Sequence, residues 1–253
     1  MPRSFRLLLC AVFVLAPGEL VAGAPRLRVL TYNIHHGEGS DRKFDLERLA
    51  KIITAAEPDV VAVQEVDRKT RRASGVDQAA ELGKLTGMHA QFGKAMAYSD
   101  GEYGEAILTR QKPTKVQVHA LPHGSGREPR AAIAVTLAAH GGLPELIFVG
   151  THLCHQSNDD RVAQAKTINE AYPPGSKTVA ILAGDLNART ASPPMREFGK
   201  QWTDTMPNRN KIDYVLVRPG DPWRVIEAKV IPEPVASDHD PVLVVLEWNG
   251  DGQ

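Results

Sequence analysis

The chain has 253 residues, of which 42% are hydrophobic and 24% are charged, and its 30 basic side chains balance 30 acidic ones. These proportions are those of an ordinary globular domain that is long enough to bury a large core. They argue against a protein built mainly to bind nucleic acid, because such proteins usually carry an excess of basic residues.

The first residues have the pattern of a secretory signal peptide. Two arginines among the first six residues precede an apolar run from Leu7 to Ala16, and small residues follow at Ala22-Gly23-Ala24. The apolar run is too short for a permanent membrane span. We therefore expect a signal peptide over residues 1–24, a single domain over residues 25–249, and an exported mature protein, periplasmic or secreted, without a transmembrane segment.

Cysteine usage indicates a fold without disulfide bonds. Cys10 falls in the expected signal peptide, so the mature chain keeps only Cys154. An exported protein of this kind must be held together by its hydrophobic core.

Hydrophobic periodicity predicts alternating strands and helices. Between residues 45 and 57, Leu46, Leu49 and Ile53 lie at helical spacing, and Pro58 follows the end of the run. The predicted strands cover residues 27–30, 60–63, 106–109, 115–120, 131–138, 146–150, 178–183, 211–217, 225–231 and 242–246, and the predicted helices cover residues 45–57, 77–86 and 159–172. This order fits an α/β fold with mixed sheets and outer helices better than a purely parallel sheet.

Polar residues follow five of the apolar runs. They are Asn33, Glu65, His152, Asp185 with Asn187, and Asp238 with His239. In open α/β sheets, ligands bind beyond the carboxyl ends of the strands. We therefore expect these side chains to gather at one edge of the fold.

The loop Ser237-Asp238-His239-Asp240-Pro241 places a histidine between two carboxylates. A carboxylate neighbour can hold a neutral imidazole in one tautomer and let it accept a proton near neutral pH. An exposed histidine between acids is also common in solvated turns, and Asp240 has the alternative role of capping the turn before Pro241. The loop alone leaves both interpretations open.

Oxygen ligands dominate the candidate site. Glu65, Asp185 and Asp238 supply carboxylates, and Asn33 and Asn187 supply amide oxygens. Such hard ligands suit Mg²⁺ or Mn²⁺, and no cysteine and histidine cluster with zinc spacing competes. Each residue taken singly is explained as well by a cap or a turn, but together they predict a site for Mg²⁺ (or Mn²⁺).

Seven short motifs lie in order along the chain. They are Thr31-Tyr32-Asn33-Ile34, Gln64-Glu65-Val66, Tyr103-Gly104-Glu105-Ala106-Ile107-Leu108, Thr151-His152-Leu153, Gly184-Asp185-Leu186-Asn187, Ile212-Asp213-Tyr214 and Ser237-Asp238-His239. Between residues 26 and 246, the chain resembles the endonuclease/exonuclease/phosphatase family. The resemblance implies a DNase I-like four-layer α/β sandwich, with two mixed β-sheets packed together and helices outside, and a catalytic domain at residues 25–249 that cleaves phosphoester bonds with the help of a metal ion.

The resemblance also implies a role for each matching residue. Glu65 becomes the main metal ligand, with Asn33 beside it, and Asp238 supports the metal or its waters. A metal at this position neutralises charge that grows on the phosphate oxygens.

The catalytic roles follow in the same way. His239 becomes the general base or a phosphate-contacting histidine, and Asp213 its carboxylate partner. Asp185 and Asn187 position the nucleophile and the scissile phosphate. His152 contacts the phosphate and assists the leaving group.

Two residues depart from the family pattern. Glu105 stands where family members commonly have asparagine, and it adds a negative charge near the expected cleft. Cys154 stands where the subgroup often has aspartate, and we expect it to be a small buried residue because no redox or catalytic pattern surrounds it.

Four further residues are candidate substrate contacts: Arg130, Tyr103, Arg71 and His35. Arg71 belongs to the basic stretch Arg68-Lys69-Thr70-Arg71-Arg72. That stretch is interpreted either as a solvated loop or as a docking site for a substrate phosphate.

The favoured function is that of an exported, divalent-metal-dependent phosphohydrolase, most simply a phosphodiesterase, whose partner is a phosphoester substrate rather than another protein. A nuclease for DNA or RNA and a phospholipid or sphingomyelin-type phosphodiesterase are alternatives on the same fold. A binding module without catalytic activity is less favoured, because every metal and histidine position of the motifs is filled.

Overall fold

A computed structural model describes residues 23–175, 178–207, 209 and 211–250. Residues 1–22 of the expected signal peptide lie outside the described residues, so that expectation keeps its basis in the sequence alone. Among the described residues, no helix is long and apolar enough to cross a membrane.

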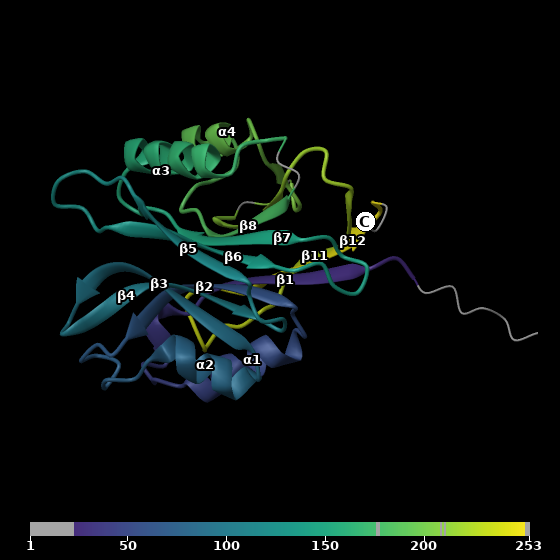
Figure 1. Cartoon of the computed structure of the whole chain (residues 1–253). Coiled ribbons are helices and arrows are strands. Elements are labelled where there is room, and N and C mark those ends of the chain that lie inside the picture. The colour runs from purple at the N-terminus through teal and green to yellow at the C-terminus, as the bar shows by residue number, and fades with distance from the viewer. Residues whose placement is uncertain (1–22, 176–177, 208, 210, 251–253) are drawn as a thin grey trace, which may run out of the picture.

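In the described part of the chain, twelve strands form two six-stranded β-sheets (Figure 1). The first sheet has the strand order β11-β12-β1-β2-β4-β3, with β1 at Arg26–Asn33, β2 at Val60–Arg68, β3 at His89–Tyr98, β4 at Gly101–Thr109, β11 at Trp223–Val230 and β12 at Val242–Trp248. The second sheet has the order β5-β6-β7-β8-β10-β9, with β5 at Lys115–Leu121, β6 at Arg130–Leu137, β7 at Leu146–His152, β8 at Val179–Asp185, β9 at Thr203–Asp204 and β10 at Asp213–Val217. Both sheets mix parallel and antiparallel pairs.

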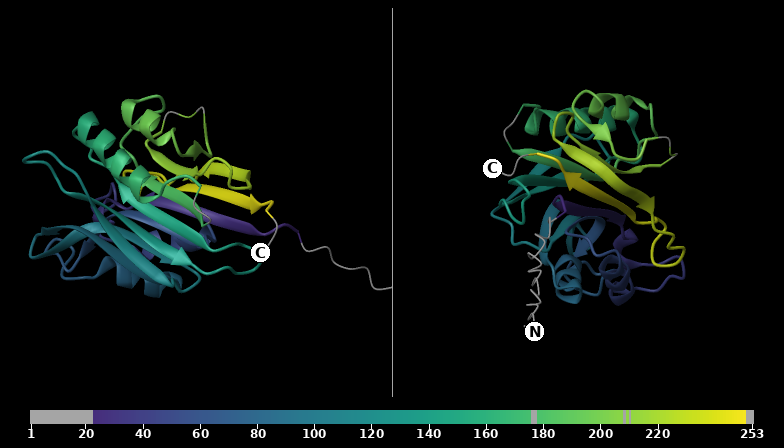
Figure 2. Two further views of the ribbon diagram at one scale, coloured as in Figure 1. Left: turned by 45° about the horizontal axis from the view of Figure 1, so that its top comes forward. Right: turned by 90° about the vertical axis from the view of Figure 1, so that its right-hand side faces the viewer.

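Helices cover the outer face of each sheet, as two views show (Figures 1 and 2). Helices α1 (Leu46–Ala55) and α2 (Gln78–Thr86) pack on the first sheet, and α3 (Asn158–Ala171) and α4 (Pro193–Phe198) pack on the second. A short 3-10 helix, η1 (His35–Gly37), follows β1. The molecule is therefore a four-layer α/β sandwich of the DNase I-like kind, which confirms the predicted fold.

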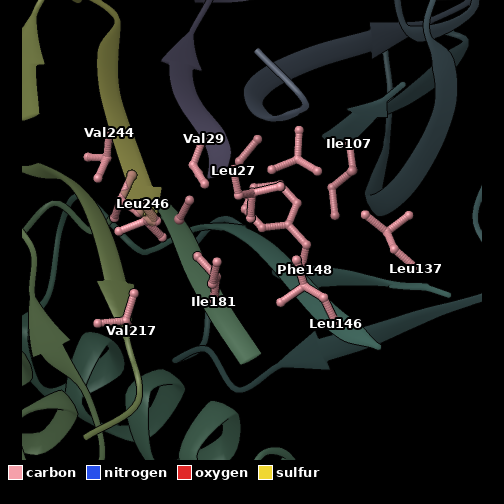
Figure 3. Packing of buried hydrophobic residues seen from close by; sticks show 14 of the residues in the cluster. Leu27, Val29, Ile107, Leu137, Leu146, Phe148, Ile181, Val217, Val244 and Leu246 are labelled. Atoms are coloured by element: carbon pink, nitrogen blue, oxygen red, sulfur yellow. The ribbon is translucent and has the colours of Figure 1, made fainter. Parts of the chain in front are cut away.

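The core between the sheets consists of aliphatic side chains around Phe148 (Figure 3). Val29 from β1 and Val244 from β12 meet Ile181 from β8 across the interface. Every second residue of a strand points to this face, while the alternate residues face the outer helices. Both faces of the central strands are thus buried, which explains why their sequences read as nearly continuous apolar runs.

Local sequence signals set the helix boundaries. The Asp45 carboxylate accepts a hydrogen bond from the Arg48 backbone N–H at 2.8 Å and caps α1, whose residues Leu49 and Ile53 are buried against the first sheet. Ser157 caps α3 in the same way through the Asp160 N–H at 3.2 Å. The predicted helices at residues 45–57, 77–86 and 159–172 therefore correspond to α1, α2 and α3.

The strand register brings distant polar residues to one edge. The parallel pair β1 and β2 places Asn33 beside Gln64, and the parallel pair β7 and β8 places His152 opposite Asp185. The antiparallel pair β8 and β10 places Asp213 opposite Asp185. Two parallel pairs, one in each sheet, thus end at the same side of the sandwich.

Four elements were not predicted from the sequence: η1, which has only three residues, and β3, β9 and α4. The sequence of β3 has few β-branched residues, and the strand exists because it pairs with β4 along its length. Strand β9 has two residues and α4 has six, which is too short for a periodic signal.

Candidate active site

A cavity of about 420 Å³ opens at the edge where the parallel strand pairs end. It is lined by His35, His36, Glu65, Arg72, Met96, Tyr98, Tyr103, Glu128, Arg130, His152, His155, Asp185, Asn187, Asp238 and His239. Because both sheets contribute, the site exists only when the sheets are packed together.

The first sheet supplies Asn33 and Glu65. Asn33 ends β1 and is 1% exposed, and its Nδ2 donates to Glu65 Oε1 at 3.0 Å and to Asp185 Oδ2 at 3.2 Å. One amide therefore joins a carboxylate of the first sheet to a carboxylate of the second.

A backbone irregularity in β2 aims Glu65 into the cavity. The register of β2 against β4 shifts between Val63 and Val66, and Glu65 has a φ of 60°. Bulges of this kind redirect a side chain at the edge of a site. A left-handed backbone at a residue other than glycine costs free energy, and the surrounding sheet must supply it.

Polar neighbours keep the Glu65 carboxylate ionised. Burial alone would raise its pKa, but the His36 ring, with Nδ1 3.9 Å from Oε2, and the Asn33 amide hold the pKa well below its usual range. An ionised, partly desolvated carboxylate is a suitable ligand for a hard cation.

The second sheet and the last loop bring together Asp185, Asp213 and His239. His239 Nδ1 lies 3.0 Å from Asp213 Oδ2, and His239 Nε2 lies 3.7 Å from Asp185 Oδ2. The loop that carries His239 is fixed by Ser237, whose hydroxyl donates to the Asn33 carbonyl at 2.7 Å and accepts from the His239 N–H at 3.2 Å. The last loop is therefore tied to the end of β1.

The carboxylates around His239 favour its protonated form. Burial alone would lower the pKa of His239, but the hydrogen bond and charge of Asp213, followed by the charges of Asp185 and Asp238, raise it to about 9. The pKa of Asp185 is raised, because the carboxyl is buried and lies beside Asp213. Three carboxyl groups, those of Asp185, Asp213 and Asp238, thus act on this one histidine.

His152 has the opposite environment. It is 3% exposed, and the Arg130 Nη1 atom lies 2.9 Å from its Nδ1. A guanidinium can only donate, so Nδ1 is the acceptor and Nε2 carries the proton. The Nε2–H then faces Asp185 Oδ2 at 3.4 Å, while the donor atom Asn187 Nδ2, which donates to the Leu153 carbonyl at 3.0 Å, lies 3.0 Å from the same ring nitrogen. Burial, followed by the charge of Arg130, holds the pKa of His152 well below its usual value, so this histidine is neutral.

The donor set fits a divalent metal. In the described structure, the ligand atoms of Asp185, Asp213 and His239 all lie within 4.8 Å of one another. The buried Asp213 Oδ1 atom has no hydrogen-bond partner among the described residues. A cation near Asp185 would offset the repulsion between these carboxylates, and Asp185 Oδ2 is joined to Glu65 through the Asn33 amide.

Three of the four predicted substrate contacts, Arg130, Tyr103 and His35, line the cavity. The fourth, Arg71, does not: its side chain is 76% exposed and pairs with Asp100 at 2.8 Å. Its neighbour in the same basic stretch, Arg72, lines the cavity instead.

Six lining residues lie outside the predicted list of site residues: His36, Met96, Tyr98, Arg72, Glu128 and His155. Glu128 pairs with Arg130 at 3.2 Å, and His155 Nδ1 lies 3.2 Å from Arg130 Nη2. Both residues lie within three positions of a predicted site residue in the sequence, which is the only signal that could have indicated them.

The two departures from the family pattern are both buried. Glu105 is fully buried on β4, and neither of its carboxylate oxygens has a hydrogen-bond partner among the described residues. Burial raises the pKa of this carboxyl well above its usual value. Cys154 is buried, does not line the cavity, and lies with its Sγ 3.7 Å from Asp160 Oδ2.

The fold and the site define a class of protein. A profile of the Endonuclease/Exonuclease/phosphatase family matches residues 30–239, and the chain belongs to this family. Members of this family are hydrolases that act on phosphoesters and generally depend on a divalent metal.

Solved structures of this family share the fold. An endonuclease/exonuclease/phosphatase from Beutenbergia cavernae DSM 12333 is 24% identical, with a TM-score of 0.73 over 89% of this chain and 72% of that one. The mannosyl-6-phosphatase Bt3783 of Bacteroides thetaiotaomicron VPI-5482 is 20% identical, with a TM-score of 0.71 over 88% of this chain and 100% of that one. The catalytic domain of human Nocturnin, solved with a bound sulfate anion, is 19% identical, with a TM-score of 0.69 over 89% of this chain and 96% of that one. No curated protein sequence matches the chain.

Proposed function

We propose that the protein is a divalent-metal-dependent phosphodiesterase. The observation that carries the proposal is the pair of His239 and Asp213, held at 3.0 Å beside the buried carboxylate of Asp185. An imidazole held by a carboxylate is a general base for activating water. The family membership supports hydrolysis of a phosphoester.

Oxygen ligands from the first sheet and from the loop before β12 would hold the metal, which we propose to be Mg²⁺ or Mn²⁺. Glu65 and Asp238 would bind it, and rotation of the Asn33 amide would offer its oxygen. When bound, such an ion polarises a phosphoryl oxygen and neutralises the charge that develops on it.

The protein's own side chains handle the proton and the phosphate. His239 Nε2 accepts a proton from water, while Asp213 fixes the ring through Nδ1. The neutral His152 cannot act as a base through Nδ1, which accepts from Arg130, so its Nε2–H donates to a phosphate oxygen. Arg130 and Asn187 complete a set of donors that holds the phosphate in line for attack.

A diester is favoured over a monoester because the cavity continues past the catalytic residues. It reaches a second group of residues, Met96, Tyr98 and Arg72, which leaves room for a substituent on the far side of the phosphorus. A phosphomonoesterase is the second candidate, and the name of the mannosyl-6-phosphatase, which shares the fold, supports it. The balanced charge of the chain and the walls around the cavity argue against duplex DNA as the main substrate.

A panel of phosphoesters tests this function. Bis(p-nitrophenyl) phosphate, p-nitrophenyl phosphate, a hexose 6-phosphate, duplex DNA, RNA, phospholipid and sphingomyelin would be assayed with Mg²⁺, with Mn²⁺ and with EDTA. We expect metal-dependent cleavage of the diester and a loss of about 10²-fold or more in His239→Ala. Unchanged activity of His239→Ala, or no cleavage of any phosphoester with metal, would refute the proposal.

We also propose that the protein is exported. The support is the sequence alone: a basic start, an apolar run and small residues up to Ala24. Expression of the full chain followed by cell fractionation and mass spectrometry of the mature amino terminus should show cleavage near residues 22–24. A full-length product that stays in the cytoplasm would contradict this proposal.

A further inference from the structure

The cavity has a wall that takes no part in the chemistry described above. It consists of Arg72 from the segment after β2, Met96 and Tyr98 from β3, and Tyr103 from β4, and we name it the Arg72 wall. These residues all come from the first sheet and its loops. Arg130 lies on the second sheet and its side chain interacts with Tyr103, so the wall and the Arg130 group are adjoining surfaces of the same cavity.

Arg72 is held rigidly at this wall. Its Nε donates to Asp67 Oδ2 at 2.6 Å and its Nη2 donates to Asp67 Oδ1 at 2.9 Å. Asp67 is fully buried and is itself fixed by the Thr70 hydroxyl at 2.7 Å, while its backbone N–H donates to Gln78 at 2.8 Å. The guanidinium therefore loses little conformational entropy when it binds a ligand.

Two aromatic rings also position the guanidinium. Its central carbon lies 4.6 Å from the centroid of the Tyr98 ring and 5.5 Å from that of Tyr103, and the two rings are 6.2 Å apart. Such contacts keep a cation in place without using its N–H donors. The pKa of Arg72, which burial alone would lower, is raised by Asp67, so the group stays charged.

One edge of the guanidinium stays available. Five N–H donors belong to an arginine side chain, and Asp67 accepts from two of them. No described residue accepts from the other three, and the side chain is 31% exposed at the cavity. One acid of the lining, Glu128, is already paired with Arg130.

We propose that the Arg72 wall binds a second anionic oxygen group, a carboxylate or another phosphate, that the substrate carries on its alcohol portion. An open guanidinium edge matches the geometry of such groups and binds them through charge-assisted hydrogen bonds. Met96 and the tyrosine rings pack against the carbon chain between the two anions. The inference rests on the proposed function, because it takes the cavity to be the substrate site.

Matched phosphonates test the proposal by isothermal titration calorimetry in the presence of Mg²⁺. One arm uses α,ω-phosphonocarboxylates with one to four methylene groups, a second uses α,ω-bisphosphonates of the same lengths, and the reference is the alkylphosphonate of each length. We expect at least one length to bind wild-type protein about tenfold or more tightly than its reference. The arm that shows the larger preference identifies the carboxylate or the phosphate as the second group.

Variants test whether Arg72 causes this binding preference. Arg72→Gln leaves the buried Asp67 unpaired and risks misfolding, so the main variant is Asp67→Asn/Arg72→Gln, which replaces the ion pair with a neutral one. The control is Arg68→Gln, because Arg68 also pairs with a carboxylate, Glu102, and lies 4.5 Å from an aromatic ring, that of Phe92, but does not line the cavity. We expect the double variant to lose the preference and the control to keep it.

Two results would overturn the inference: no preference at any length in wild-type protein, or a preference that survives in the double variant. Hydrolysis of bis(p-nitrophenyl) phosphate, measured on the same samples, separates the two proposals. A binding preference without hydrolysis refutes the diesterase function but not the anion subsite. Hydrolysis without a binding preference refutes the anion subsite but not the diesterase function.

Discussion

Two histidines face the single carboxylate of Asp185, and their other neighbours give them opposite protonation states. Asp213 on the far nitrogen of His239 favours the charged ring, whereas Arg130 on the far nitrogen of His152 favours the neutral ring. In the proposed mechanism the two rings therefore have separate tasks: one exchanges a proton and the other donates a fixed hydrogen bond. The partner of each histidine, rather than the histidine itself, determines its task.

The pH dependence of the rate should follow His239. The proposed base works only when it is deprotonated, so the rate should rise as the pH approaches the His239 pKa of about 9. A cation bound nearby lowers this pKa, and it therefore moves the acidic limb of the pH–rate profile to lower pH. Asp213→Asn removes the group that raises this pKa most. We expect its acidic limb to shift to lower pH and its maximal kcat/KM to fall about 10²-fold or more.

The matched control is Asp240→Asn. Asp240 lies next to His239 in sequence, but its carboxylate accepts from the Glu233 N–H at 2.7 Å, which agrees with the predicted role of capping the turn. A pH profile of Asp240→Asn that shifts as far as that of Asp213→Asn would contradict the assigned roles.

Glu105 should weaken the fold at neutral pH. Its pKa is raised in the folded protein above the value of 4.5 expected when unfolded, so the folded state retains a proton that the unfolded state has lost. Stability therefore falls as the pH rises above about 4.5, by about 1.4 kcal/mol for each pH unit until the folded pKa is reached. Glu105→Gln removes this loss.

Urea unfolding measures the effect. We expect Glu105→Gln to match wild-type protein near pH 4 and to be more stable at pH 8, whereas Glu170→Gln, on an exposed position of α3, shows no such trend. A variant that is less stable than wild-type protein at pH 8 would show that the carboxylate is ionised and stabilising in the fold.

At the scale of elements, the site depends on how β8 passes between β7 and β10. His152 and Asp213 lie opposite Asp185 on the two flanking strands, so the register of these pairs sets the catalytic distances. A shift by one residue would turn each of these side chains to the other face of the sheet.

Gly184 maintains this register. Its φ is +154°, and a Cβ at this position would lie 1.9 Å from the Thr151 carbonyl oxygen of β7. Gly184→Ala must therefore push β7 and β8 apart. We expect a loss of about 3 kcal/mol or more in the free energy of unfolding, together with loss of activity.

Gly150→Ala on β7 is the control for this prediction. Its Cβ would meet side chains of Ile107 and Ala62 at 3.3 and 3.4 Å, which small movements can accommodate. Thermal melts of both variants decide the matter, and equal melting temperatures for the two would contradict the role of Gly184.

The sequence predicted most of this architecture because apolar runs and caps are local signals. It predicted the strands that carry Asn33, His152 and Asp185, since these strands are buried on both faces. It missed β3, whose stability comes from its partner β4 and not from its own residues. Tertiary pairing of this kind leaves no periodic pattern in the sequence.

The same limit applies to the two adjacent arginines. The sequence singled out Arg71, but the structure places Arg72 in the cavity, because buried Asp67 pairs with Arg72 while Arg71 reaches Asp100 on the surface. Which of two neighbouring side chains turns inward depends on the conformation of the loop and on a buried partner. The local sequence shows neither the loop conformation nor the buried partner.

At the scale of the whole molecule, the proposed metal site lies where the two sheets meet. Glu65 belongs to the first sheet and Asp185 to the second, and the Asn33 amide lies between them. A metal bound here stabilises the packed sandwich relative to the unfolded chain. At a free Mg²⁺ concentration of 100 times its Kd, the free energy of unfolding should increase by about 2.7 kcal/mol.

Thermal unfolding over a series of Mg²⁺ concentrations, with EDTA as the reference, measures this linkage. We expect Glu65→Gln to lose most of the increase, and the exposed-residue variant Glu170→Gln to keep it. A melting temperature that does not depend on Mg²⁺ would contradict a metal site between the sheets.

The position of β12 has a consequence for the order of events during synthesis. Strand β1 lies between β2 and β12, and Thr31 pairs with Val242, more than two hundred residues later in the chain. The loop with Asp238 and His239 leads directly into β12, so the general base reaches the site only when this last strand docks. A nascent chain therefore lacks the proposed general base at its site until β12 has left the ribosome, and the contacts that complete the first sheet are among the slowest to form.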